Sequence, residues 1–469
     1  MTSLSLLETQ GASLAATIER LVVYCRNQGI SGEYPGTSPD GLMSQPLPLS
    51  SSLSEAYRIR KSILGQLAKI QSLLQQPADF LQHLATQNQL LACLRWLGDF
   101  QVLAFIPLEG SIATRDVADL SGTPETQLTR VIHMMSTAGF LHQPQPGHVA
   151  HTSLSIPFVT NPSLLDASLF LSETAALSAF QMSAATQRFG MSDRRDETAY
   201  NLAFSTPAAF ANVYMQRPRL QRQWRAYLRF GAGDFEMDLL DILSRYNWNG
   251  LGNATVVEVG SFSTATATAL ATWYPSLHFV VQMSDPLANG HQGHLAKYNQ
   301  GLRPGSRITV QQRAPGALQT VIDAAIYIIH LHIASLAVPS AEVPARIVAE
   351  LRANIGVLRA DRRATLLLVT SPLLAPDGEA PPDVQATARL RDLSQWQLAN
   401  GRGMDMDEFF ELLSGMGDSM GRFIIVNQYS APNGALVVHE VRFQLHVERQ
   451  SEGEMAPSHR KSHATAMEH

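Results

Sequence analysis

Residues 255–282, TVVEVGSFSTATATALATWYPSLHFVVQ, contain the pattern that decides the fold. A short β-branched run passes through a single glycine into an alanine- and threonine-rich helical stretch, which leads to a second β-branched run. Three further runs follow, RITVQQ, AAIYIIHL and TLLLVT, each separated from the next by a segment of helical character. Strands that alternate with helices in this way predict an α/β fold with a doubly wound parallel sheet.

The sheet is expected to end in an antiparallel hairpin. The runs FIIVNQYS and ALVVHEVRFQ are joined by the turn-forming residues 431–434, Ala-Pro-Asn-Gly. We therefore predict one Rossmann-like domain over residues 248–448. The polar residues 449–469 are predicted to be a disordered tail.

The first half of the chain is predicted to be mainly helical. Residues 1–54 are expected to form a helical arm and linker, residues 55–152 a winged-helix domain, and residues 153–247 a helical region that lines a pocket. Between Leu90 and Thr152 the basic residues are only Arg95, Arg115 and Arg130, and acidic residues outnumber them. The basic surface that DNA binding requires is missing, so dimerisation is the favoured role of the winged helix.

Composition indicates an ordinary globular protein. The chain has 469 residues, of which 45% are hydrophobic and 16% are charged, and its net charge is −5. This charge offers no general attraction to nucleic acid or to anionic lipid. With two cysteines, no signal peptide and no long apolar run, we expect a cytoplasmic protein whose partner is a small molecule or another protein.

A sheet of this kind, preceded by a winged helix, resembles the class I O-methyltransferases of fungal and plant secondary metabolism. The segments QVLAFIPLEGSIATRDVADLSGTPETQLTRVI and FLHQPQPGHVAHT look like that family, as does the segment quoted first. The resemblance covers about residues 60 to 445. It implies a homodimer formed through the N-terminal domain and a site for S-adenosylmethionine (SAM) at the carboxyl ends of the strands.

The cofactor site that the resemblance implies is degenerate. The glycine-rich loop keeps Gly260 but continues with Ser261 and Phe262, and Met283 stands where the family has an acid for the cofactor ribose. Asp285 is a partial substitute for that acid, and Arg313 replaces the acid expected on the adenine side. We therefore expect that SAM is not required, although a retained SAM molecule is left open.

The general base of the family is missing as well. The family's His-Asp pair aligns with Ala334 and Ser335, and only a shifted register would bring His330 or His332 to the position of the base. In this respect the chain resembles the methyltransferase-like pericyclases of pyridone alkaloid biosynthesis. Such an enzyme, a cyclase of the lyase or isomerase type, would dehydrate a polyketide-derived pyridone alcohol to a quinone methide. It would then steer an Alder-ene, hetero-Diels–Alder or Diels–Alder cyclisation without methyl transfer.

A pericyclase needs an apolar cavity and a hydrogen-bond donor that polarises the substrate. The predicted donors are His133, His330 and His332. Predicted contacts of the substrate are Tyr214, Trp224, Ala334, Ser335, Gln395, Trp396 and Asn400. No metal is expected, because His291 and His294 have no evident third ligand.

Two alternatives stay open at the level of sequence. One is an active SAM-dependent O-methyltransferase acting on a polyketide hydroxyl. The other is a non-catalytic protein that pairs with another enzyme through its N-terminal region.

Overall fold

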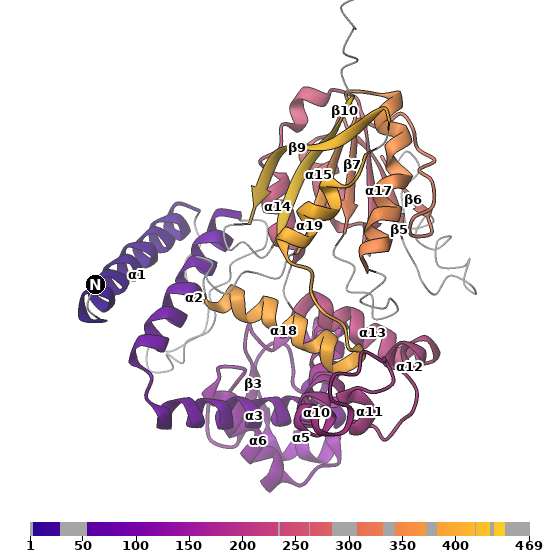
Figure 1. The fold of residues 1–469 in the computed structure, drawn as a ribbon. Coiled ribbons are helices and arrows are strands. Elements are labelled where there is room, and N and C mark those ends of the chain that lie inside the picture. Colours follow the sequence, from indigo (N-terminus) through magenta and orange to yellow (C-terminus); the bar gives the residue numbers. More distant parts are fainter. Residues whose placement is uncertain are drawn as a thin grey trace, which may run out of the picture.

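A seven-stranded sheet forms the centre of the C-terminal half of the chain (Figure 1). The computed structural model describes residues 3–28, 54–232, 235–261, 263–283, 307–331, 343–371, 382–417, 419–431 and 436–445. The predicted tail and most of the turn predicted at residues 431–434 lie outside these ranges.

The order of strands in this sheet is β6-β5-β4-β7-β8-β10-β9. The strands are β4 (Thr255–Ser261), β5 (His278–Met283), β6 (Ile308–Gln312), β7 (Ile326–His330), β8 (Thr365–Thr370), β9 (Gly421–Ser430) and β10 (Val437–Leu445). Strands β4 to β8 are parallel, whereas β10 runs antiparallel to both β8 and β9. The sequence therefore predicted the α/β class and the closing hairpin correctly.

The side chains of strand β7 are buried on both faces of the sheet. Ile326 and Ile328 belong to a core cluster with α14 (Phe235–Leu243) and α15 (Ala265–Trp273), while Tyr327 and Ile329 belong to a cluster on the opposite face. That second cluster is formed with α17 (Val343–Ala360) and α19 (Met406–Ser414). Because successive side chains of a strand point to opposite faces, a strand buried on both sides is a continuous apolar run.

A winged-helix unit precedes the sheet along the chain and lies at the bottom of Figure 1. Its elements are α3 (Pro77–Asp99), α4 (Val102–Phe105), β1 (Ile112–Ala113), α5 (Thr114–Ser121), α6 (Glu125–Thr137), β2 (Leu141–His142) and β3 (His148–His151). The three short strands pair in the order β1-β3-β2. Leu97, Leu128 and Ile132 are fully buried in its core.

A bundle of short helices follows the winged unit along the chain and precedes the sheet. It contains α7 (Ile156–Thr160), α8 (Pro162–Phe170), α9 (Ala176–Ala179), α10 (Met182–Phe189), α11 (Ala199–Ala203), α12 (Phe210–Gln216) and α13 (Pro218–Ala226). Two π-helical turns, Leu171–Ala175 and Tyr227–Gly231, and a 3₁₀ turn, Trp248–Leu251, complete the region. The long helix α18 (Pro382–Ala399) returns from the sheet domain and packs against α11 and against α2.

The N-terminal segment forms a helical hairpin. Helix α1 (Ser3–Asn27) packs along α2 (Ser54–Leu74) through the buried residues Leu21, Cys25, Ala56 and Ile59. These two helices lie in the segments predicted as an arm (residues 1–54) and as a winged-helix domain (residues 55–152). None of the described helices is long and apolar enough to cross a membrane.

Helix α2 also contacts the sheet domain through polar side chains. The Arg58 guanidinium lies 3.1 Å from a carboxylate oxygen of Asp241, and the Tyr57 hydroxyl donates to Asp238 at 3.3 Å. Both carboxylates belong to α14 and are buried. The hairpin is therefore held to the sheet domain by polar contacts as well as by its own apolar core.

Candidate functional site

The candidate site lies at the carboxyl ends of the parallel strands, because ligands bind there in doubly wound folds. Gly260 has φ +77°, which favours glycine, and a Cβ there would lie 3.4 Å from the carbonyl oxygen of His330. The buried Ser261 donates its hydroxyl to the carbonyl of Ser263 at 2.7 Å. The Ser261 side chain, at the end of β4, therefore bridges to the backbone of the turn that follows.

His330 lies beside Glu258 of the neighbouring strand. The distance from Nε2 of His330 to Oε1 of Glu258 is 2.9 Å, and the two side chains are 9% and 1% exposed. The second carboxylate oxygen of Glu258 is buried without a hydrogen-bond partner among the described residues. Because Nε2 already contacts a carboxylate within the sheet, this atom is directed into the protein and away from any substrate at the strand ends.

Arg313 follows β6, and its guanidinium also points into the protein. Nη1 lies 2.5 Å from Oε1 of Glu350 on α17, Nη2 donates to the carbonyl of Ala317, and both charged side chains are less than a tenth exposed. The other oxygen of Glu350 accepts the backbone N–H of Gly316 at 2.7 Å. Arg313, which replaces the acid expected beside adenine, therefore has an internal counter-ion. Met283 packs against the core cluster under α14 and α15.

Sequence reasoning missed a buried amide network next to these residues. Gln282 of β5 and Gln319 exchange two side-chain hydrogen bonds of 2.8 and 3.0 Å, and the Gln319 amide also donates to Asn354 at 3.5 Å. All three side chains are buried. The signal was the single glutamine inside the apolar run HFVVQM, because a polar side chain at a buried strand position must find a partner.

The aromatic residues expected to contact a substrate lie in a packed cluster. The ring of Trp224 is 4% exposed and its centroid lies 5.1 Å from that of Phe170 and 5.9 Å from those of Phe210 and Tyr227. Tyr214 is half-buried at the margin, 6.3 Å from Phe210. Trp224 therefore belongs to the core of the helical bundle.

The residues predicted on α18 lie near its end. Gln395 is half-buried and Trp396 is 39% exposed. Asn400 follows the helix with φ +51°, and its amide donates to the carbonyls of Arg194 at 2.6 Å and Glu197 at 3.2 Å. An asparagine in this conformation ends a helix, so Asn400 joins α18 to the loop before α11.

Of the remaining predicted residues, the structure describes only His133, which lies in the winged unit. His133 is exposed on α6, a helix that packs against α3 and α5 in the winged unit. Five predicted site residues lie outside the described part of the chain, namely Phe262, Asp285, His332, Ala334 and Ser335. His291 and His294 lie outside it as well. Within the described ranges no group of three or more His, Cys, Asp or Glu side chains could hold a metal ion.

Comparison with known proteins identifies two kinds of relative. A family model described as the N-terminal domain of the trypacidin cluster transcriptional coactivator tpcD matches residues 4–75. The chain is 42% identical to the monodictyphenone cluster transcriptional coactivator mdpA of Emericella nidulans, covering 95% of this chain and 99% of that protein. It is also 42% identical to tpcD of Aspergillus fumigatus, covering 95% and 97%.

Solved structures share the fold at low identity. The crystal structure of OxaC has a TM-score of 0.61 at 16% identity and covers 94% of this chain and all of that chain. A structure described as a pericyclic reaction enzyme has a TM-score of 0.61 at 16% identity, covering 83% and 94%. These likenesses establish an O-methyltransferase-like fold, and at such identity they establish the fold alone.

The predicted pericyclase function is wrong. The relatives that match almost the full length at 42% identity are named transcriptional coactivators, and the pericyclic enzyme shares only the fold. The same finding corrects the assignment to an enzyme family and the O-methyltransferase alternative. It also corrects the predicted partners, a pyridone substrate and a second copy of the chain, because a coactivator implies a different protein as its partner. None of the predicted functions was a role in transcription.

Proposed function

The chain belongs to the family of tpcD-like transcriptional coactivators of fungal secondary-metabolite clusters, and from this we propose that it promotes transcription of such a cluster together with a DNA-binding protein. The observation that carries the proposal is 42% identity over almost the entire length of both chains. An identity spread over the whole length includes the N-terminal hairpin, which the family model matches on its own at residues 4–75.

The winged unit supports a role beside a DNA-binding protein. A protein that binds DNA neutralises phosphates with clustered Lys and Arg side chains. Here Arg95 lies 3.4 Å from Asp99 on the same helix, and the helix expected to enter a DNA groove, α6, carries one basic residue, Arg130, and one acid, Glu125. We therefore propose that sequence recognition belongs to the partner and that this chain works in the nucleus.

The internal hydrogen bonds at the carboxyl ends of the parallel strands support a role without catalysis. Ser261, His330 and Arg313 each contact a neighbouring group of the protein itself. Hydrogen bonds between buried groups of one chain stabilise its fold. We propose that the methyltransferase-like domain serves as a scaffold and that SAM is not required.

The proposal is tested in the fungus that carries the gene. Deletion should lower the transcripts of the neighbouring biosynthetic genes, measured by quantitative PCR against genes outside the cluster, and reintroduction of the wild-type gene should restore them. The purified chain alone should not shift promoter DNA in a gel. Unchanged cluster transcripts after deletion would overturn the proposal.

A further inference from the structure

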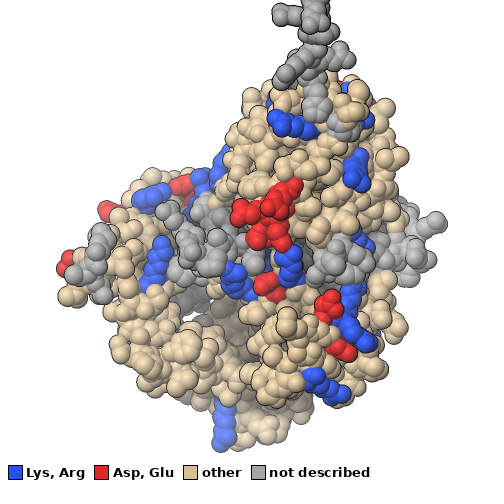
Figure 2. Space-filling model, viewed as in Figure 1, with Lys and Arg blue, Asp and Glu red and all other residues tan. Residues whose placement is uncertain are grey.

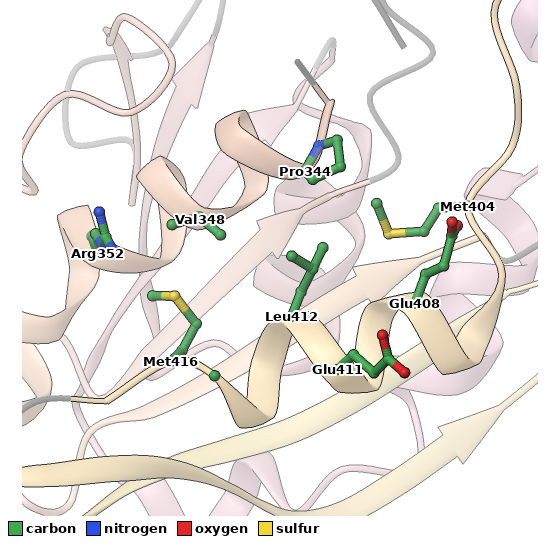
Figure 3. Close-up of a pocket in the computed structure, with 9 residues that line it drawn as sticks. Pro344, Val348, Arg352, Met404, Glu408, Glu411, Leu412 and Met416 are labelled. Carbon is green, nitrogen blue, oxygen red and sulfur yellow. The ribbon is translucent and has the colours of Figure 1, made fainter. Parts of the chain in front are cut away.

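A groove runs between α17 and α19 on the outer side of the sheet domain (Figure 3). Its volume is about 430 Å³, and it is lined by Pro344, Val348, Arg352, Met404, Glu408, Glu411, Leu412, Gly415 and Met416. None of these residues belongs to the strand ends described above. The groove is therefore a second candidate site, separate from the degenerate cofactor site.

The lining residues recur at helical spacing on both walls. Pro344, Val348 and Arg352 follow one another at intervals of four on α17, and Glu408 and Leu412 do the same on α19. Residues four apart lie on one face of a helix, so each wall presents one continuous stripe. The stripe on α17 is about 12 Å long, since a helix rises about 1.5 Å per residue. A segment of about two helical turns fits along it.

The floor of the groove is apolar and partly open. Val348, Met404 and Leu412 are half-buried in the chain alone, and Met416 is buried beneath them. Methionine side chains adapt to different apolar partners, and exposed apolar grooves with such side chains bind amphipathic helices. The floor is therefore suited to the apolar face of a helix.

The two ends of the groove carry opposite charges. Arg352 lies at one end in Figure 3, and Glu408 and Glu411 lie at the other. The Glu408 carboxylate lies 2.5 Å from the guanidinium of Arg402, whereas Glu411 and Asp407, one turn apart on α19, form no ion pair within the described part of the chain. The acidic residues of α19 contribute to the red patch near the centre of Figure 2. Carboxylates at this rim would repel nucleic acid and anionic lipid.

We propose that this groove binds an amphipathic helix of the DNA-binding partner, with basic residues beside Glu411 and an acidic residue beside Arg352. The positive end of a helix dipole is its N-terminus, so the N-terminus of the bound helix lies at the carboxylate end. Basic residues are plentiful in proteins that bind DNA, which provides the complementary charge. The inference rests on the proposed function, because it names the surface through which the coactivator reaches its partner.

The charge pattern is tested with two fluorescent model peptides and the full chain. The first is a leucine-faced helix of about four turns in which arginines and a glutamate lie about two turns apart, with the arginines nearer the N-terminus, and its twin has the two charges exchanged. Fluorescence anisotropy should show the first peptide binding more tightly than the twin. Glu411→Lys should weaken its binding by roughly 5- to 10-fold, while Glu125→Lys, on the winged unit, should not.

A double variant separates an effect on binding from an effect on folding, because its expected result is tighter binding of one peptide, which a misfolded protein would not show. Arg352→Glu with Glu411→Lys reverses both ends of the groove and should bind the twin more tightly than the first peptide. A preference that does not invert, or equal binding of both peptides by the wild-type chain, would overturn the proposal. Leu412→Asp should abolish binding of both peptides while the far-ultraviolet circular dichroism spectrum is unchanged.

Failure of this inference can be told apart from failure of the proposed function. In the fungus, Leu412→Asp at the native locus should lower cluster transcripts to the level of the deletion strain, at unchanged amounts of the protein. If deletion lowers the transcripts and Leu412→Asp does not, the groove is not the docking surface and the coactivator function still holds. If deletion itself has no effect, the proposed function fails whatever the peptides show.

Discussion

His439 on β10 is fully buried between two aromatic rings, with centroid distances of 5.0 Å to Phe409 and 5.7 Å to Phe410. Its Nε2 lies 3.2 Å from the hydroxyl of Thr370 at the end of β8. Burial lowers the pKa of this imidazole to about 4, because the charged form would lose its hydration. The residue is therefore neutral in the folded protein at pH values where an exposed histidine is half charged.

This buried histidine predicts a loss of stability in mild acid. Between about pH 6.5 and about pH 4 the unfolded chain binds a proton at His439 that the folded chain does not, so the free energy of unfolding falls as the pH falls. The loss from this residue is about 3 kcal/mol, at roughly 1.4 kcal/mol per pKa unit. His439→Gln, which does not titrate, should lose less stability between about pH 7 and about pH 4.5 in urea unfolding. Equal losses in both proteins would contradict the prediction.

The buried pair of Arg313 and Glu350 predicts a strongly non-additive response to substitution. Arg313→Met leaves the carboxylate of Glu350 buried without its counter-ion, and this should cost about 3–5 kcal/mol of unfolding free energy. Adding Glu350→Gln removes the uncompensated charge but keeps an acceptor for the N–H of Gly316, so the double variant should be more stable than Arg313→Met alone. Additive losses in a double-mutant cycle would show that the two side chains do not interact.

Among the elements, the α1–α2 hairpin is the part that the family model matches by itself. Its apolar core is small, and α1 contacts the rest of the described chain chiefly through α2. Burial of a few apolar side chains stabilises such a contact by only a few kcal/mol. One substitution in this core should therefore release α1 and leave the sheet domain folded.

Leu21→Asp is the substitution that tests the hairpin. It places a carboxylate against Ile59 and Cys25, where no cation is present among the core residues, and should separate α1 from α2 at a cost of about 3 kcal/mol or more. Limited proteolysis should then remove α1, and cluster transcripts in the fungus should fall towards the level of the deletion strain. Ala16→Ser, on the exposed side of α1, is the matched control and should leave both readouts unchanged. Full transcription with a cleaved α1 would show that the hairpin is dispensable.

For the molecule as a whole, the fold is that of an O-methyltransferase and the sequence family is that of coactivators. We expect isothermal titration of the full chain with SAM to give no saturable heat below about the millimolar range. The physical reason is that Arg313 is paired with Glu350 and that the turn after Gly260 is closed by Ser261. Binding at micromolar SAM would contradict this expectation and would revive a cofactor role for the scaffold.

Much of the fold could be predicted because its elements carry local signals. All six residues of β8 are buried, and the run TLLLVT, apolar between its two threonines, is recognisable as a central strand. The winged unit was recognisable from its helices and its short hairpin. The function could not be predicted in the same way. The loss of catalytic residues does not indicate which function replaces catalysis, and no residue pattern in this chain indicates protein binding. A degenerate methyltransferase site is expected of a pericyclase and of a coactivator alike.

The sequence by itself determined the strands, the helices and the class of fold, because those depend on residues close together in the chain. Only the tertiary structure decided which polar groups meet. Glu258 and His330 are 72 positions apart, and Gln282 and Gln319 are 37 apart. The groove likewise exists only where α17 and α19 pack on one face of the sheet. Contacts at such separations are set by the packing of whole elements, and no local pattern of residues records them.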